Sequence, residues 1–207
     1  MVPPPFPTQP RKQPSQQRSR ATVTAILDAA ARILERDGNF AAFNTNRVAE
    51  LAGVSVGSLY QYFPNKEALL AGLQRRRFQT VLDILQQVDD SHRGRPLRDL
   101  LAALVRGLVA FGAKSPRLDR TLDLNVAGPG ELDLKAATYA EGHRRLRAML
   151  EPYHAALAVP DLDLACFIIG RLFESVLRAA AEERPGDLIS GRIADELLGL
   201  LCRYLGA

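Results

Sequence analysis

The chain has 207 residues, of which 47% are hydrophobic and 24% charged, and its formal net charge is +4. A chain of this length and apolar content can bury the core of one large domain or two small ones, which makes it globular. The two cysteines, Cys166 and Cys202, lie far apart in apolar helical patterns without a Cys-x-x-Cys or Cys/His group, so we expect reduced core residues, no metal site and no cofactor. No stretch approaches the ~20 apolar residues of a membrane span, and the N-terminus lacks a signal-peptide pattern. We expect a cytoplasmic protein with no membrane partner.

The charge is unevenly distributed along the chain. Up to residue 80 there are 11 Lys+Arg and 5 Asp+Glu, a balance of +6, whereas the remaining 16 and 18 give −2. This asymmetry favours a polyanion as the partner of the N-terminal part. On charge alone, a basic surface without any partner stays open.

Residues 1–19 are rich in Pro, Gln and Ser and carry Arg11, Lys12 and Arg18. Such a composition buries too little apolar area to offset its ordering entropy, which predicts a flexible basic arm. A tail without a role is the favoured interpretation; the alternative is an arm that follows the DNA backbone or enters a minor groove.

From Ala21 the pattern becomes helical, and Gly38 ends this first helix after Asp37. Apolar residues recur at steps of three and four, at Val23, Ile26, Ala30 and Ile33.

Two short helices follow. In "NTNRVAELAG", Asn44 or Thr45 can cap the N-terminus, and Gly53 ends the helix. Ser55 can cap the next helix, "VGSLYQYF", and Pro64-Asn65 ends it before a long helix opens at Lys66. Two helices joined by a short turn with glycine match the helix-turn-helix unit, whose second helix lies in the DNA major groove. We therefore predict a DNA-binding domain over residues 20–65.

The segment "TNRVAELAGVSVGSLYQYFPNKEALL", Thr45 to Leu70, resembles the N-terminal signature of the TetR (tetracycline repressor) family of bacterial one-component regulators. The resemblance covers roughly residues 20 to 75, together with the all-helical pattern and the total length. It implies an all-α fold, in which a three-helix helix-turn-helix domain precedes a larger helical bundle over residues 66–207 for ligand binding and dimerisation. It also implies a transcriptional regulator, in most cases a repressor. Such a protein binds a (pseudo)palindromic double-stranded DNA operator as a homodimer and is released by a small-molecule effector, whose identity the sequence does not give.

The resemblance implies three phosphate contacts, at Thr45, Tyr60 and Lys66. Hydroxyl donors and an ammonium beside a helix N-terminus suit phosphate and fix the register on the duplex. The structural alternative for Tyr60 is a half-buried ring over the three-helix core.

Helical spacing places a second group of residues of the third helix toward the groove: Val56, Gly57, Ser58, Gln61 and Tyr62. None is charged, so readout is expected to lean toward A·T pairs. Gln61 suits adenine or a water-bridged contact, Ser58 suits either an acceptor or a donor, and Val56 suits a thymine methyl. Asn46 and Arg47 are further candidates, and Arg47 is expected to contact either the backbone or a guanine.

Beyond the fourth helix, Pro/Gly breaks fall near residues 91–96, 114–116, 125–130, 158–161 and 183–187. The last two helices, about 161–183 and 187–205, carry apolar residues around most of their circumference. One stripe can pack inside the subunit while the other needs a partner. The resemblance implies that this helix pair is the homodimer interface.

The resemblance also implies an effector pocket among the middle helices. The candidate lining residues are Phe111, Leu118, Leu122, Tyr139, His143 and Arg171. The basic run at 143–147 can face an anionic ligand, although a solvated helix face is the favoured interpretation.

An enzyme is the rival from another class. The sequence contains no Gly-x-Ser-x-Gly, no phosphate loop and no His-Glu-x-x-His, and its three histidines are scattered. We therefore expect no catalytic residues. The alternatives to an effector-controlled regulator are an effector-independent helical DNA-binding protein and, less favoured, a helical enzyme.

Overall fold

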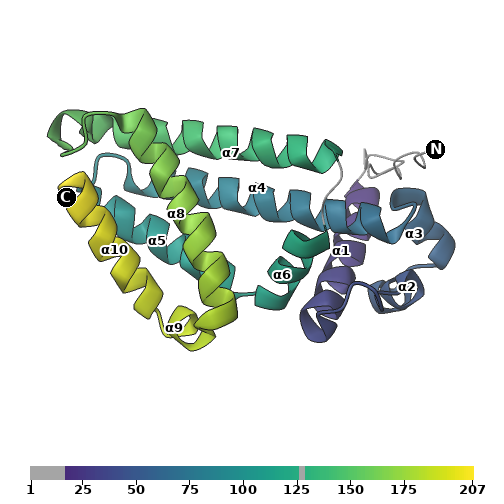
Figure 1. The fold of residues 1–207 in the computed structure, drawn as a ribbon. Coiled ribbons are helices and arrows are strands. Elements are labelled where there is room, and N and C mark those ends of the chain that lie inside the picture. Colours follow the sequence, from purple (N-terminus) through teal and green to yellow (C-terminus); the bar gives the residue numbers. More distant parts are fainter. Residues whose placement is uncertain (1–16, 126–128) are drawn as a thin grey trace, which may run out of the picture. The chain divides into compact units, whose positions relative to one another are not determined.

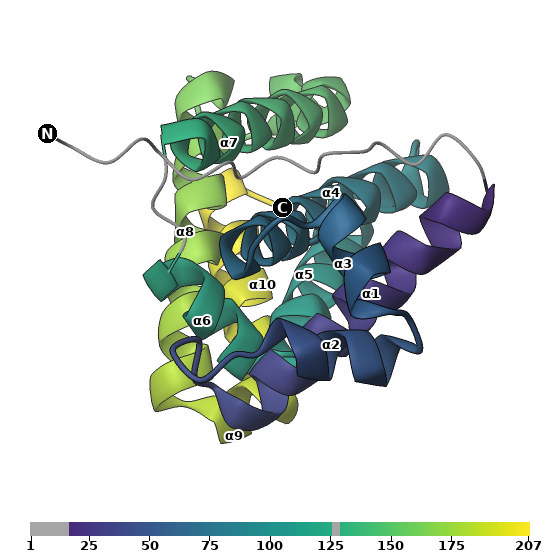
Figure 2. The same cartoon turned by 90° about the vertical axis from the view of Figure 1, so that its right-hand side faces the viewer.

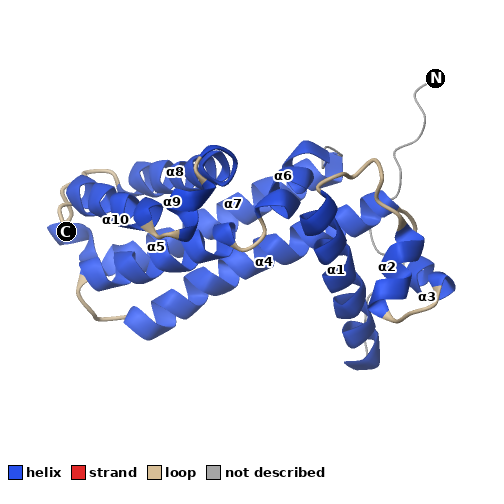
Figure 3. Ribbon diagram, turned by 90° about the horizontal axis from the view of Figure 1, so that it is seen from below, coloured by secondary structure: helices blue, strands red, loops and turns tan. Residues whose placement is uncertain are grey.

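The computed structural model describes residues 17–125 and 129–207, and the regular structure in these ranges is entirely helical (Figure 3). The helices are α1 (Gln17–Asp37), α2 (Thr45–Ala52), α3 (Val56–Tyr62), α4 (Lys66–His92), α5 (Leu97–Ala113), α6 (Pro116–Asn125), α7 (Pro129–Leu150), the 3₁₀ helix η1 (Glu151–Ala156), α8 (Leu162–Glu183), α9 (Pro185–Ile189) and α10 (Arg192–Leu205). The all-α expectation is confirmed. The expected flexible arm lies outside the described residues as far as residue 16, and α1 begins at Gln17, upstream of Ala21.

The chain folds into two compact units. One comprises Met1–Arg77 and Arg117–Leu134, and the other Phe78–Pro116 and Lys135–Ala207. Helix α4 is therefore shared between them, and α6 from Arg117 onward belongs with the helix-turn-helix. The boundary predicted at residues 65 and 66 is a functional division and stays a prediction.

The core of the first unit collects the apolar faces of α1, α2, α3, the first turns of α4, and α6. Helix α1 lies against α2, which contacts α3 (Figure 2). Ile26, Leu34 and Leu59 are fully buried there. Gly72 of α4 allows close packing, since a Cβ at this position would lie 2.9 Å from Cε1 of Phe63.

Local capping fixes the two short helices of this unit. The Asn44 side chain accepts a 2.8 Å hydrogen bond from the Asn46 N–H at the start of α2. Gly53 ends α2 with φ of 68°, a left-handed conformation that glycine adopts without steric cost. The Ser55 Oγ accepts a 3.0 Å bond from the Ser58 N–H and caps α3. The predicted caps and turn are confirmed.

The second unit is built around α5, which contacts α8, α9 and α10 (Figure 1). Four α5 residues are almost completely buried in its core: Leu100, Leu101, Leu104 and Val105. None of the helices among the described residues has the length and apolarity needed to cross a membrane.

The end of the chain differs from the expected single helix at 187–205. The structure has two helices, α9 and α10, with Ser190 and Gly191 between them. Gly191 has φ of 85°, which breaks the helix because this left-handed conformation cannot continue it. Helix α8 matches its predicted range of 161–183 closely.

Candidate nucleic-acid interface

The hydroxyls of Thr45 and Tyr60 lie together at the start of α2 and on α3. Their oxygens are 3.0 Å apart, and either can be the donor. Tyr60 is 40% exposed, in contrast to the buried Leu59 beside it. Because one of the two hydroxyls donates to the other, the pair leaves one O–H group that can donate to a phosphate oxygen.

Lys66, the first residue of α4, has its ammonium 4.6 Å from the centroid of the Phe40 ring. This cation–π contact restricts a side chain that is otherwise long and mobile. A cation at a helix N-terminus is disfavoured by the macrodipole, so the ring compensates for an unfavourable position.

The outer face of α3 is exposed and uncharged. Val56 is 40% exposed, and Gly57 and Gln61 are also exposed. Ser58 is half-buried, with its Oγ 2.8 Å from the Ser55 Oγ. This surface can approach base edges without the repulsion that an acid would add.

Tyr62 corrects the expectation that it faces the groove beside Gln61. Its side chain is only 8% exposed and belongs to the core of the first unit. The reason is helical spacing: Tyr62 follows the buried Leu59 by three positions, which puts both on one face of α3.

At the start of α2, Asn46 and Arg47 are exposed. The Arg47 guanidinium lies 3.2 Å from Oδ2 of Asp37, the last residue of α1. Asp37 also accepts a 2.7 Å bond from Nε of Arg36. This hydrogen bond and the charges of both arginines lower the pKa of Asp37. Sequence reasoning missed Asp37, although an acid at a helix C-terminus, where the dipole disfavours it, was a usable signal.

Two expected pocket residues, Leu118 and Leu122 of α6, are 3% and 2% exposed in the core of the first unit. The start of α6 is fixed to the end of α1, because the Leu118 N–H donates a 2.8 Å bond to Glu35 and an Arg117 guanidinium N–H donates a 3.0 Å bond to the Arg36 carbonyl. Both leucines belong to this core, and their assignment to an effector pocket stays a prediction.

Arg77 of α4 and Asp119 of α6 form an ion pair within the first unit. Burial raises the pKa of Asp119 to about 7, against the opposing effect of the Arg77 charge. The same burial lowers the pKa of Arg77. This pair is a largely desolvated charge contact between α6 and α4.

The other expected pocket residues lie in the second unit. The guanidinium carbon of Arg171, on α8, lies 4.1 Å from the ring centroid of Tyr139 on α7 and 5.6 Å from that of Phe167. His143 contacts Asp163 at 2.8 Å, and Phe111 is half-buried on α5. The structure brings Tyr139 and Arg171 together, whereas His143 is engaged with Asp163.

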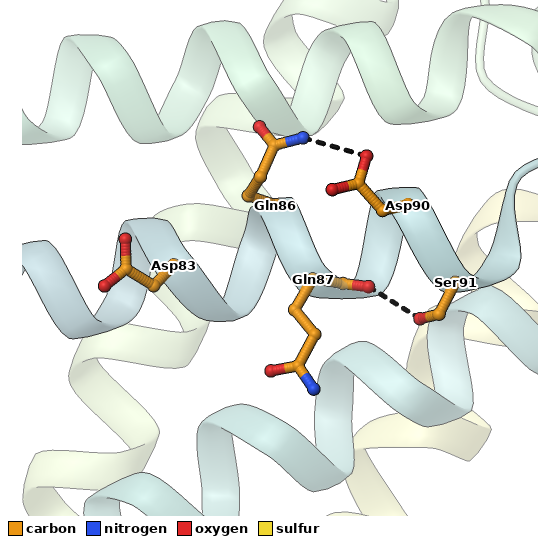
Figure 4. A pocket seen from close by; sticks show the side chains of 5 residues that line it. All are labelled: Asp83, Gln86, Gln87, Asp90 and Ser91. Atoms are coloured by element: carbon orange, nitrogen blue, oxygen red, sulfur yellow. Dashed lines mark hydrogen bonds between the residues drawn. The ribbon is translucent and has the colours of Figure 1, made fainter.

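An open depression of about 470 Å³ also lies in the second unit, on α4. It is lined by Asp83, Gln86, Gln87, Asp90 and Ser91 (Figure 4). The Gln86 amide donates a 3.0 Å bond to Asp90, and the Ser91 hydroxyl donates to the Gln87 carbonyl. None of the expected pocket residues lines it. Among the described residues, no group of three or more His, Cys, Asp or Glu side chains is arranged to hold a metal ion.

Helical structure throughout the described residues, with a capped helix-turn-helix whose second helix has an exposed face, defines the class of helix-turn-helix DNA-binding proteins. The chain belongs to the tetracycline repressor family. Residues 26–73 match the family model of bacterial regulatory proteins of the tetR family, and residues 96–205 match that of the tetracyclin repressor-like C-terminal domain. The family is one of DNA-binding regulators, not of enzymes.

Among the relatives, the nucleoid occlusion factor SlmA of Haemophilus ducreyi is 26% identical over 119 residues, which is 56% of this chain and 58% of that protein. The chain therefore spans about half the length of the curated relatives it matches. SmeT, the repressor of the Stenotrophomonas maltophilia multidrug efflux pump SmeDEF, is 21% identical with a TM-score of 0.67, covering 89% of this chain and 92% of its own. A further SmeT structure is a complex with triclosan. A TetR-family regulator from Mesorhizobium loti is 20% identical with a TM-score of 0.70, covering 91% and 98%.

Proposed function

We propose that the protein is a one-component repressor that binds a (pseudo)palindromic operator as a homodimer and is released by a small-molecule effector. The observation that carries the DNA-binding part is the exposed, uncharged face of α3 beside the paired hydroxyls of Thr45 and Tyr60, 3.0 Å apart. In this reading the hydroxyls and Lys66 contact phosphates, which fixes the register, while Val56 and Gln61 meet base edges. Gly57 and Ser58 allow the helix backbone to approach them.

Dimerisation is supported by the outer face of α8, which exposes large apolar side chains. Leu164 and Phe167 are each 53% exposed and Ile168 is 42% exposed, while Leu200 of α10 adds 42%. The three α8 residues stand at positions i, i+3 and i+4 and therefore share one face, and an exposed apolar face of this kind marks an interface. A two-fold dimer also presents two recognition helices to half-sites about 34–36 Å apart.

The effector part draws on the relatives, since SmeT forms a complex with triclosan. In the second unit of this chain, the candidates for ligand contacts are the half-buried Phe111, Tyr139 and His143 and the exposed Arg171. An effector-independent DNA-binding protein is the second candidate. It is favoured by the depression on α4, because none of the expected pocket residues lines it.

The test is a DNA-binding titration with a labelled fragment from the protein's own upstream region, alongside a scrambled duplex of equal length. We expect selective binding of the upstream fragment, with an affinity that falls steeply with salt at about 0.9 log units per log unit of salt for each phosphate neutralised. Hydrophobic compounds such as triclosan are then added to the complex. Release by a compound supports the repressor, whereas binding that no compound weakens supports the effector-independent protein. Equal, salt-insensitive affinity for both duplexes contradicts the proposal.

A further inference from the structure

Asp37 and Arg47 each stand at a helix end where the dipole disfavours their charge. Asp37 is the last residue of α1, at the negative end of that helix, and Arg47 lies in the first turn of α2, at the positive end. Neither placement stabilises its own helix. The two charges compensate each other across the α1–α2 junction, where a guanidinium nitrogen of Arg47 lies 3.2 Å from Asp37 Oδ2.

The Asp37 carboxylate has a second cationic partner besides Arg47. Its nearest partner is Arg36, which donates from Nε at 2.7 Å and from a terminal nitrogen at 3.2 Å. The Arg47 side chain is 53% exposed and makes a single contact to the same carboxylate. A solvent-exposed contact of this kind is worth up to about 1 kcal/mol, which is enough to compete with a phosphate oxygen for the Arg47 guanidinium.

We propose that Asp37 restrains DNA binding by holding Arg47, so that this guanidinium is withheld from the phosphate backbone. The proposal rests on the DNA-binding function proposed above and adds to it a residue that sets affinity. A carboxylate and a phosphate oxygen compete for the same N–H donors of arginine. While Asp37 holds Arg47, the protein neutralises one DNA phosphate fewer than it would if the Arg47 guanidinium were free to bind the backbone.

The restraint is independent of sequence, because phosphates are the same on every duplex. Removing the carboxylate therefore raises the affinity for operator and scrambled DNA alike. We expect the Asp37 charge to lower the affinity for DNA through its contact with Arg47, and not through the net charge of the protein.

The experiment compares wild type, Asp37→Asn, Arg47→Ala and the double variant by fluorescence anisotropy with upstream and scrambled duplexes over a range of salt concentrations. Asp37→Asn is expected to tighten binding to both duplexes by about two- to fivefold, the scale of an exposed ion pair. It is also expected to steepen the salt dependence by about 0.9, which is one phosphate. In the Arg47→Ala background, the same change should have no such effect.

Asp28→Asn is the matched control, since it removes an equal charge from the same helix, where Asp28 pairs with Arg76 at 2.6 Å. It should leave the salt dependence unchanged. Asp37→Ser, checked by thermal unfolding, repeats the test with a different neutral side chain. Equal gains from Asp37→Asn and Asp28→Asn, a gain that survives Arg47→Ala, or weaker binding by both Asp37 variants would each overturn the proposal. If the wild type itself binds no duplex, the DNA-binding function fails first, and that result is distinct from a wild type that binds while Asp37→Asn adds nothing.

Discussion

Two tyrosines of α3 have opposite surroundings although only Gln61 separates them. Tyr60 is 40% exposed and its hydroxyl meets Thr45, whereas Tyr62 is 8% exposed within the core. Because both residues are tyrosines, Tyr→Phe removes the same hydroxyl at each position. The two substitutions therefore compare an exposed hydroxyl with one on a ring that packs in the core.

Tyr60→Phe is expected to weaken operator binding by about two- to tenfold, the cost of one hydrogen bond of about 0.5–1.5 kcal/mol. The salt dependence should not change, because a hydroxyl carries no charge. Tyr62→Phe should leave the affinity within about twofold, since its ring stays in place. Titration of both variants with the upstream duplex checks this, and a larger loss for Tyr62→Phe than for Tyr60→Phe would contradict the assignment of the two faces.

The exposed side of α3 could be predicted from sequence in part. The pattern identifies Leu59 and Phe63 as buried because they stand four apart, and it leaves Gln61 outside, as the structure has it. Tyr62 was placed on the groove face because only Leu59 and Phe63 were assigned to the buried side, whereas its spacing of three from Leu59 puts it on the core face as well. The Asp37–Arg47 contact joins two helices, and the distance between helices is not encoded in local periodicity.

At the scale of elements, the first unit depends on a close approach between α4 and α3. A Cβ at Gly72 would lie 2.9 Å from Phe63 Cε1 and 3.1 Å from a methyl group of Leu27. Both side chains belong to the buried core, where Phe63 is 1% and Leu27 7% exposed.

Gly72→Ala is therefore expected to lower the free energy of unfolding by about 1–3 kcal/mol through overpacking. Gly142→Ala in α7 is the control, because a Cβ there meets only ordinary contacts at 4.0 Å. That variant should be neutral or stabilising by up to about 1 kcal/mol, as alanine is the better helix former. Denaturant unfolding measures both, and a Gly72→Ala protein as stable as Gly142→Ala would show that the packing is looser than described.

The Arg77–Asp119 pair makes the attachment of α6 dependent on pH. The pKa of Asp119 is raised to about 7 in the folded protein, against about 3.9 in an unfolded chain, so the folded state binds a proton that the unfolded state has lost. This contribution to stability is fully present below about pH 4 and is lost as the pH rises through 7.

Asp119→Asn keeps the neutral form at every pH. The wild type should lose stability as Asp119 ionises, so the free energy of unfolding of Asp119→Asn minus that of wild type should increase by on the order of 1–3 kcal/mol from pH 5 to pH 8. Asp28→Asn, which alters an exposed pair on α1, should track the wild type. Unfolding curves at both pH values decide the matter, and a constant difference between Asp119→Asn and wild type would contradict the raised pKa.

Most helices could be predicted from apolar spacing and Pro/Gly breaks, but two features of the later elements could not. The expected helix at 187–205 is interrupted at Gly191, where a single glycine within an apolar pattern does not reveal its left-handed conformation. Helix α6 joins the first unit through Leu118 and Leu122. Its sequence shows an amphipathic face but not the surface against which that face packs.

At the scale of the whole molecule, the exposed apolar side chains of α8 support the proposed dimer. Gly170 lies among them, and a Cβ at this position would have no neighbour within 4 Å in one subunit. The face thus combines large apolar side chains with a position where a second backbone can come close.

Phe167→Asp is expected to convert a dimer into a monomer in light scattering, because it buries a charge in the proposed interface. Leu124→Asp is the control, since Leu124 of α6 is even more exposed, at 71%, but lies outside α8 and α10. That variant should stay dimeric. The monomer should also bind a half-site weakly and lose preference for the palindrome. A Phe167→Asp dimer of unchanged mass would move the interface elsewhere.

The most direct measurement asks whether position 61 reaches a base edge in the major groove. The Gln61→Cys variant is mixed with an operator that carries a thiol-tethered adenine at successive positions, and Ala140→Cys on the exposed surface of α7 serves as the reference. The native Cys166 and Cys202 are buried and should not react. We predict that the thiol introduced by Gln61→Cys forms a disulfide cross-link with one adenine position in each half-site, and that Ala140→Cys forms none. Equal yields from both variants, or no cross-link from Gln61→Cys at any base, would contradict the placement of α3 in the major groove.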